Sequence, residues 1–263
     1  MLSKIKTITQ NCIYMKTLIF GDIHGRTQWY DIFMKEQPDK IIFLGDYVSS
    51  HENITPEQQC SNLEDILNFK EENYDDVILL RGNHDLQHLN YYWAYCTGYE
   101  RKVGEYMLSI KDRFLSYTQW VTIIDDIIFS HAGISKTWFK SLNLGEPTKE
   151  NILKINDLEP SELFAFTPER YSDYCGDSVT QPCTWIRPTS LLLDCLDDWI
   201  QVVGHTRPYK AGNVLGDGYL EDYRESYKFN IPELWCIDAM PSQYMVIENN
   251  IREMKTFNNN IEI

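Results

Sequence analysis

The chain has 263 residues, and its composition of 43% hydrophobic and 24% charged residues suits a folded globular protein and excludes an intrinsically disordered one. Its formal net charge of −15 at pH 7 repels polyanions and argues against a surface that binds a nucleic acid polymer. A small anionic substrate would therefore need local positive charge, which bound divalent cations supply.

Seven cysteines are scattered along the chain without a CxxC pair, which argues against a disulfide framework. Residues 1–20 lack the apolar core and cleavage site of a signal peptide, and no stretch reaches membrane-spanning length. We therefore expect a reduced, cytoplasmic protein that has no membrane partner. Met15 lies next to the first apolar run and resembles a translation start, so we expect residues 1–14 to be an N-terminal extension and residues 15–263 to form a single domain.

Three short apolar runs, each ended by a glycine and a polar residue, predict buried strands at residues 17–20, 41–44 and 77–80. Helical patterns at residues 28–36 and about 56–72 lie between them. The β-α-β-α-β order predicts adjacent parallel strands with right-handed crossovers. In such a sheet the carboxyl ends of neighbouring strands lie side by side, which is where ligands bind.

Two later regions are expected to be cap segments inserted into the domain, at about residues 86–118 and 141–190. The first contains an aromatic cluster in a stretch that we predict to be helical. This cluster can stack a nucleobase or pack the cap against the body, and packing is the commoner use. The cluster comprises Tyr91, Tyr92, Trp93, Tyr95 and Tyr99.

Further strands are predicted at residues 121–124 and 127–130, with Asp125-Asp126 as a tight hairpin turn between them. Apolar runs near the end of the chain predict strands at residues 200–203, 234–237 and 244–247. The chain shows no internal repeat, so one elaborated domain fits it better than two.

Polar side chains follow five of the predicted strands. Asp22 and His24 are two residues apart, which places them on the same side of an extended segment. A strand-end aspartate is often only a helix cap, but a core has no reason to gather carboxylates and imidazoles at one sheet edge. Such a mixed oxygen and nitrogen shell suits manganese, iron or zinc. The set comprises Asp22, His24, Asp46, Asn83, His84, His131 and His205.

Five segments of the chain resemble, in order, the motifs of the calcineurin-like metallophosphoesterase family. They read GDIHG at 21–25, GDYV at 45–48, RGNHD at 81–85, SHAG at 130–133 and VVGHT at 202–206. Among the branches of the family, the chain is most similar to the serine/threonine protein phosphatases and the dinucleoside-tetraphosphate hydrolases. The resemblance implies an α/β fold, an α+β sandwich of two packed mixed β-sheets flanked by helices.

The resemblance also implies two divalent metal ions, of which manganese is the first choice and iron or zinc the alternatives. Asp22 and His24 would bind one ion and Asn83, His131 and His205 the other, with Asp46 bridging both. A hydroxide between the ions would attack phosphorus in line. His84 would act as the general acid, so that His84 and Asp46 are the expected catalytic residues.

The chain departs from the phosphatase motif GDxVDRG, because Ser49, Ser50 and His51 follow GDYV. The aspartate that orients the catalytic histidine and the arginine that grips phosphate are therefore missing. We expect Arg187 to replace that arginine, since a similar Trp-x-Arg segment grips phosphate in related bacterial enzymes. A surface salt bridge is the alternative role for Arg187.

Two further residues complete the expected phosphate contacts, Asn83 and Arg207. Arg207 occupies the place where other branches carry a second histidine, which favours the protein-phosphatase-like branch. Arg26 and Arg81 are weaker candidates for the same role. His51 and His88 are left out of the site, since both are expected to be solvated.

The leading hypothesis is hydrolysis of a phosphate monoester, carried by a phosphoprotein or a small phosphorylated metabolite. The alternatives are a dinucleoside polyphosphate hydrolase or phosphodiesterase and, because of the missing residues, a binding scaffold with weak catalysis. The sequence alone determines neither the substrate nor the oligomeric state.

Overall fold

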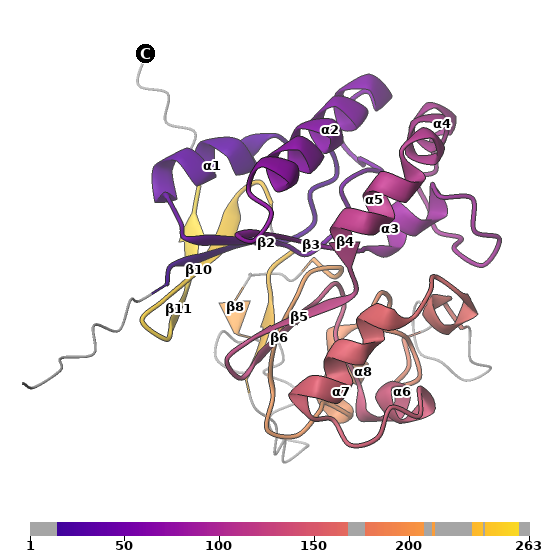
Figure 1. Ribbon diagram of the computed structural model, residues 1–263, viewed down its shortest axis with the longest axis vertical. Coiled ribbons are helices and arrows are strands. Elements are labelled where there is room, and N and C mark those ends of the chain that lie inside the picture. Colours follow the sequence, from indigo (N-terminus) through magenta and orange to yellow (C-terminus); the bar gives the residue numbers. More distant parts are fainter. Residues whose placement is uncertain (1–14, 168–176, 208–211, 214–232, 239, 258–263) are drawn as a thin grey trace, which may run out of the picture.

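The computed structural model describes residues 15–167, 177–207, 212–213, 233–238 and 240–257. Two mixed β-sheets are stacked face to face, and helices cover their outer faces (Figure 1). This arrangement confirms the fold class expected from the sequence. The extension predicted at residues 1–14 lies outside the described residues, as do Cys12 and Cys175, and the five described cysteines are free thiols.

The first sheet has the strand order β11-β10-β1-β2-β3-β4. Its central strands β1, β2 and β3 are parallel, as predicted, and the short β4 adds to them in parallel. β10 and β11 continue the sheet on the other side in antiparallel register. The strands are β1 Thr17–Phe20, β2 Lys40–Phe43, β3 Val77–Leu80, β4 Thr118–Gln119, β10 Gln243–Glu248 and β11 Ile251–Thr256.

The second sheet has the order β5-β6-β7-β9-β8, in which β6, β7 and β9 are parallel and the outer pairs are antiparallel. The predicted hairpin joins β5 to β6, with Asp125 at a φ of 54° in the turn. The strands are β5 Val121–Ile124, β6 Ile127–Ser130, β7 Ile200–Val203, β8 Gly212–Asn213 and β9 Leu234–Cys236.

Helices α1 and α2 connect β1, β2 and β3 and lie over the outer face of the first sheet (Figure 1). α2 begins after the N-cap residue Thr55, which forms a capping box with Gln58, and Pro56 occupies the first turn. The helices are α1 Gln28–Glu36, α2 Pro56–Glu72, α3 Asn83–Gln87, α4 Arg101–Ser109, α5 Lys111–Tyr117, α6 Lys136–Ser141, α7 Lys149–Leu153, α8 Pro188–Leu193 and the 3₁₀ helices η1 Lys154–Asp157 and η2 Glu162–Phe164.

Alternating side chains of the parallel strands serve two different cores. Leu18 and Phe20 of β1 face the helices, whereas Ile19 between them faces the second sheet. There Ile19 meets Phe129 of β6 and Val202 of β7 in a fully buried layer between the sheets. Because each strand is buried on both faces, it reads as a continuous apolar run in the sequence.

One sequence prediction was wrong in this part of the molecule, and strand β11 was missed. The aromatic stretch between residues 88 and 100 is irregular rather than helical, and helix resumes only at α4. β11 was not predicted, because it is an edge strand whose polar and apolar residues read like a loop. Its hairpin turn, Asn249-Asn250, has φ values of 55° and 60°, a conformation that asparagine tolerates. The Asn-Asn pair was the sequence signal for this hairpin, and it was missed.

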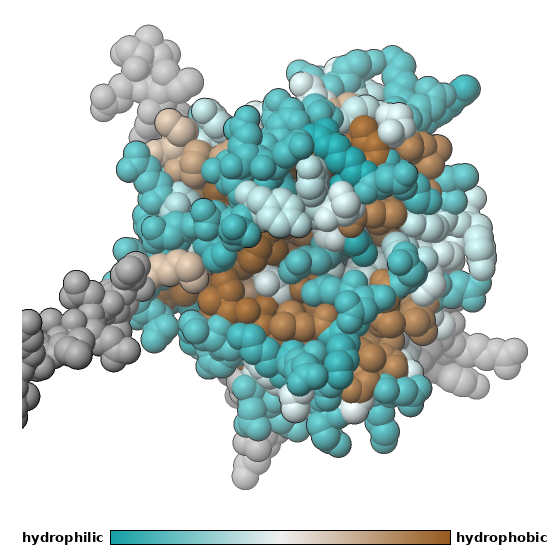
Figure 2. Space-filling view, in the orientation of Figure 1, coloured by the Kyte–Doolittle hydropathy of each residue, from teal (hydrophilic) through white to brown (hydrophobic). Residues whose placement is uncertain are grey.

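On the face of the molecule in Figure 2, hydrophobic residues gather in a band across the middle, at the level of β5, between hydrophilic surfaces above and below. This band lies where the sheets of the sandwich adjoin (Figure 1). Within the described residues, no helix has the length and apolar character needed to cross a membrane.

Glu36 at the end of α1 ties this helix to the edge of the first sheet. Its carboxylate accepts hydrogen bonds from Tyr244 (2.7 Å) and Lys255 (3.0 Å) and pairs with Lys16 at 2.7 Å. Partial burial opposes the charge of Glu36, but these three partners outweigh it and lower the pKa to about 2.

We expect Glu36→Gln to reduce the free energy of unfolding at neutral pH by about 1–2 kcal/mol. Since the folded-state pKa is depressed, the contribution is complete above the ordinary carboxyl pKa of 4.5 and is lost as the pH falls toward about 2. Urea unfolding at several pH values measures this, with Glu105→Gln in an exposed pair as the control. A difference between variant and wild type that stays constant down to acid pH would contradict the assignment.

Candidate metal centre

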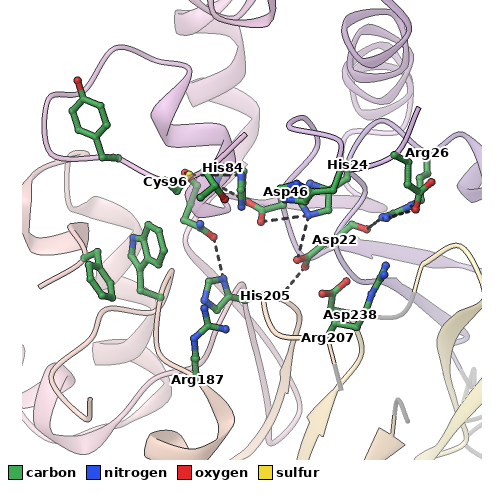
Figure 3. A pocket seen from close by; sticks show the side chains of 17 residues that line it. Asp22, His24, Arg26, Asp46, His84, Cys96, Arg187, His205, Arg207 and Asp238 are labelled. Carbon is green, nitrogen blue, oxygen red and sulfur yellow. Dashed lines mark hydrogen bonds and ion pairs between the residues drawn. The ribbon is translucent and has the colours of Figure 1, made fainter. Parts of the chain in front are cut away.

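The carboxyl ends of the parallel strands from both sheets meet at one edge of the sandwich. Six side chains with metal-binding atoms follow these strand ends, and five of them line a pocket of about 590 Å³ (Figure 3). The sixth, His131, is fully buried behind it. Side chains from segments far apart in the sequence are thereby brought together, namely Asp22, His24, Asp46, Asn83, His131 and His205.

These side chains form two groups that share one carboxylate. Ligand atoms of Asp22, His24 and Asp46 lie within 4.8 Å of one another, and so do those of Asp46, His131 and His205. Asn83 joins the second group, because its Oδ1 lies 2.9 Å from His131 Nε2 and 3.0 Å from His205 Nδ1. Two groups of candidate ligands therefore share the carboxylate of Asp46.

Backbone carbonyls fix the orientation of two imidazole rings. His24 Nδ1 donates to Val48 O and His131 Nδ1 donates to Leu44 O, each at 2.9 Å. Nε2 of each ring therefore faces Asp46 Oδ2, at 4.0 Å for His24 and 3.4 Å for His131. Imidazoles held in this way by outer partners are typical of metal ligands.

Close backbone approach makes two glycines necessary at the site. A Cβ on Gly82 would lie 2.1 Å from Asp46 Oδ1, and one on Gly204 would lie 2.3 Å from Asp22 Oδ1. Three ligands are themselves in the left-handed region, with φ values of 47°, 50° and 61° for His24, Asp46 and His205. Such conformations in non-glycine residues cluster at functional sites, where the surrounding structure enforces them.

Asp85 was not singled out in the sequence, although it organises the site. It is fully buried, and its carboxylate accepts the backbone N–H groups of Gly82 (2.9 Å), Asp46 (2.9 Å) and Tyr47 (2.8 Å). It thus caps α3 and joins the loop after β3 to the loop after β2. Its position three residues after Gly82 was the available signal.

Burial penalises charge on the candidate ligands, and neighbouring charges add to this penalty at Asp22 and outweigh it at His131. Burial and the neighbouring Asp238 raise the pKa of Asp22 well above its usual value. Burial lowers the pKa of His24 to about 4 and that of His205 well below the usual range. For His131 burial opposes the charge, but the adjacent Asp46 outweighs it and raises the pKa to about 10.

Two divalent cations fit these donors. Asp22 and Asp46 are 2% and 1% exposed, and Nε2 of His205 is buried without a hydrogen-bond partner. Cationic charge would satisfy the buried carboxylates and take the place of the proton that Asp46 favours on His131. Oxygen and imidazole donors without a thiolate suit manganese, iron or zinc.

His84 lines the pocket, and the side chains beside it are Gln87 and Ser49 in place of the aspartate of the family motif. Ser49 is buried and accepts a hydrogen bond of 3.0 Å from Gln87 Nε2, and the same nitrogen lies 3.3 Å from His84 Nδ1. Gln87 Nε2 also donates to Thr97 O at 3.0 Å, which fixes the amide orientation. An amide nitrogen carries only two protons, and its shorter contacts are with Ser49 and Thr97, so the longer contact with His84 Nδ1 positions the edge of the ring.

Of the four arginines considered from the sequence, three line the pocket and Arg81 does not. Arg187 lines the pocket, where Nη1 donates to Thr206 Oγ1 at 3.3 Å, and it forms no ion pair with a described carboxylate. Arg207 lines the opposite flank and donates to Met240 O at 3.2 Å. Arg26 is paired with Glu52 at 2.7 Å, and the buried Arg81 donates to Thr118 O at 2.6 Å, away from the pocket.

His51 and His88 differ from the expectation that both are merely solvated. His51 is exposed, yet it lines the pocket with its ring 5.7 Å from those of His24 and His84. His88 is 1% exposed; it donates to His84 O at 2.9 Å and stacks on Tyr99. His88 is thus a buried structural residue and was predicted wrongly.

The aromatic cluster is divided between packing and the pocket. Tyr91 and Trp93 stack on each other and pack against the core, whereas Tyr95 is 82% exposed and lines the pocket. Phe166 and Trp185 line the same pocket with ring centroids 5.1 Å apart.

Comparison with known proteins gives one family. Residues 15–235 match the sequence profile of the calcineurin-like phosphoesterases. A search of curated proteins returned no match.

The solved structures with a similar fold include two phosphatases. The cold-active protein-tyrosine phosphatase of a Shewanella species is 17% identical, with a TM-score of 0.54 over 93% of this chain and 80% of that one. A serine/threonine phosphatase from Saccharomyces cerevisiae with similarity to human PP5 is 16% identical, with a TM-score of 0.55 over 95% and 82%.

Gln87→Ala should lower kcat about tenfold for an alkyl phosphate, because His84 loses a side chain that holds its ring in place for proton transfer. An aryl phosphate, whose leaving group needs less protonation, should be affected less. Steady-state kinetics on both substrates measure the difference, and Gln119→Ala is the control. Equal losses on both substrates would mean that Gln87 acts only on the structure.

Removal of divalent cations by a chelator should lower the melting temperature. At a concentration of about 100 Kd, one bound cation stabilises the fold by about 2.7 kcal/mol. A melting temperature that does not respond to manganese would contradict the metal centre.

Cation affinity should also rise with pH. His131, with its pKa raised to about 10, carries a proton at neutral pH and must release it to bind a metal. Calorimetric titration in buffers of different ionisation enthalpy counts the protons released. For one proton, the affinity should increase up to about tenfold per pH unit. An affinity that falls with increasing pH would contradict this assignment.

Proposed function

Because the chain belongs to the calcineurin-like phosphoesterase family, we propose that this metal-dependent hydrolase of phosphoric esters acts on phosphate monoesters with two divalent cations. The substrate would be a phosphoprotein or a small phosphorylated metabolite, and manganese is the ion that we expect first. The observation that carries the proposal is the position of Asp46, whose carboxylate belongs to both ligand groups.

The ligand set would hold the cations as two sites, with Asp22 and His24 at one, Asn83, His131 and His205 at the other, and Asp46 at both. When bound, the cations supply positive charge that stabilises the phosphate oxygens in the transition state. A monoester dianion needs such charge, and the chain as a whole, at −15, does not offer it.

Side chains at the pocket would bind the phosphate and handle the proton. Arg187, which has no ion-pair partner in the described structure, can form paired hydrogen bonds with phosphate oxygens, and Asn83 and Arg207 would add contacts. His84, in its imidazolium form, would deliver a proton to the leaving oxygen and become the neutral ring.

The two phosphatases with a similar fold act, by their names, on phosphotyrosine and on phosphoserine or phosphothreonine. These are monoesters, which supports the first choice. We propose no nucleic acid polymer or membrane as a partner.

A dinucleoside polyphosphate hydrolase or phosphodiesterase is the second candidate, and one observation favours it. Phe166, Trp185 and Tyr95 line the pocket, and such side chains can stack on a nucleobase. A catalytically weak scaffold is the third candidate. The retained ligand set argues against it, since a scaffold has no need of buried carboxylates and imidazoles facing one another.

A substrate panel with manganese separates these functions. We expect turnover of phosphotyrosine, phosphoserine and small metabolite monoesters, and little of dinucleoside tetraphosphate or a phosphodiester. Turnover of the dinucleoside polyphosphate without that of any monoester would favour the second candidate. No turnover of the whole panel by metal-loaded protein would favour the scaffold.

Variants test the proposed roles. Asp46→Asn should abolish activity, and His84→Ala should lower kcat about 100-fold or more. Arg187→Lys should raise KM, because lysine cannot form the paired hydrogen bonds of a guanidinium. Arg101→Lys on the exposed surface of α4 is the control. Unchanged turnover in both Asp46→Asn and His84→Ala would refute these assignments.

A further inference from the structure

Asp238 is a buried carboxylate that the sequence analysis did not select. It lies two residues beyond β9, so it follows a strand end like the proposed metal ligands. The residue is 7% exposed, it lines the pocket, and its Oδ1 has no hydrogen-bond partner. A buried carboxylate without a donor is costly, and the fold retains it here beside other carboxylates.

The nearby arginines have other partners. Arg26 pairs with Glu52 at 2.7 Å, and Arg207 donates to Met240 O at 3.2 Å. In the described part of the structure, neither forms an ion pair with Asp238. The side chain of Asp238 points toward Asp22 (Figure 3), so two buried carboxylates face each other.

We propose that Asp238 belongs to the outer shell of the cation held by Asp22 and His24. Its carboxylate does not fall within the group formed by Asp22, His24 and Asp46, which places it outside the direct ligands. From there it adds negative charge and a hydrogen-bond acceptor that orient the groups around the cation. This inference rests on the metal centre proposed above.

A structural role is the competing explanation, in which Asp238 only anchors Arg207. The two roles predict different effects on cation binding. As an outer-shell residue, Asp238 affects cation affinity and Arg207 does not. As an anchor, both residues affect the binding of substrate and neither affects that of the cation.

The test uses the full chain, freed of metal and titrated with manganese in a calorimeter. In Asp238→Asn, one of the two binding steps should weaken by about 10–100-fold, and the other should change by less than about threefold. Glu52→Gln is the matched control, because it removes one negative charge from the same pocket, and it should change neither step by more than about threefold.

Thermal melting gives a second measurement. Asparagine removes the repulsion with Asp22, so metal-free Asp238→Asn should melt at or above the temperature of the wild type, and manganese should raise its melting temperature less. A purely structural carboxylate would have the opposite effect, destabilising the metal-free protein when it is replaced. If Asp238→Asn does not fold, the same titration is made on Asp238→Ser.

Two results would overturn the proposal. The first is unchanged cation binding in Asp238→Asn. If Asp238→Asn and Arg207→Met then both raise KM, Asp238 is an anchor for Arg207. Equal weakening of cation binding in Arg207→Met is the other. Failure of the wild type to bind two cations would instead refute the metal centre itself, so the two failures are distinguishable.

Discussion

The rest of the site depends on how Asp46 is held. Its backbone oxygen accepts the N–H groups of Ile23 (3.1 Å) and His24 (2.7 Å), and its own N–H donates to Asp85 (2.9 Å). Oδ1 accepts the N–H of His84 at 2.8 Å, which leaves Oδ2 to face the imidazoles. Through this one residue, the loops after β1, β2 and β3 are fixed with respect to one another.

This arrangement concentrates unfavourable charge in the buried wall of the pocket. Asp22, Asp46 and Asp238 are all more than nine-tenths buried, and they are opposed by imidazoles, by backbone N–H groups and, near Asp238, by the charges of Arg26 and Arg207. A fold selected for stability alone would replace them, since buried charges without partners are destabilising. Bound cations would remove this conflict, which is why we propose that the site holds metal.

The chain has rearranged the groups around His84 and the phosphate. Ser49 has replaced the expected aspartate, and Gln87 from one turn further along α3 contacts both Ser49 and His84. On the other flank, Arg187 is positioned by the loop before α8, where Asp177 accepts its backbone N–H at 2.9 Å. Neither Gln87 nor Arg187 is adjacent in sequence to the motif position whose role we propose for it.

The sequence by itself determined the parallel strands and the residues at their ends, because doubly buried strands are continuous apolar runs and glycine marks where the backbone turns toward a ligand. It did not determine the pairing of β11, the burial of His88 or the irregular conformation of the aromatic stretch, because these follow from edge pairing and burial in the folded chain. Only the tertiary structure revealed Gln87, Asp85 and Asp238. Asp85 and Gln87 have local contacts within α3, but Asp85 also binds the loop after β2 and Gln87 also binds Ser49, and no local pattern encodes such contacts between distant segments.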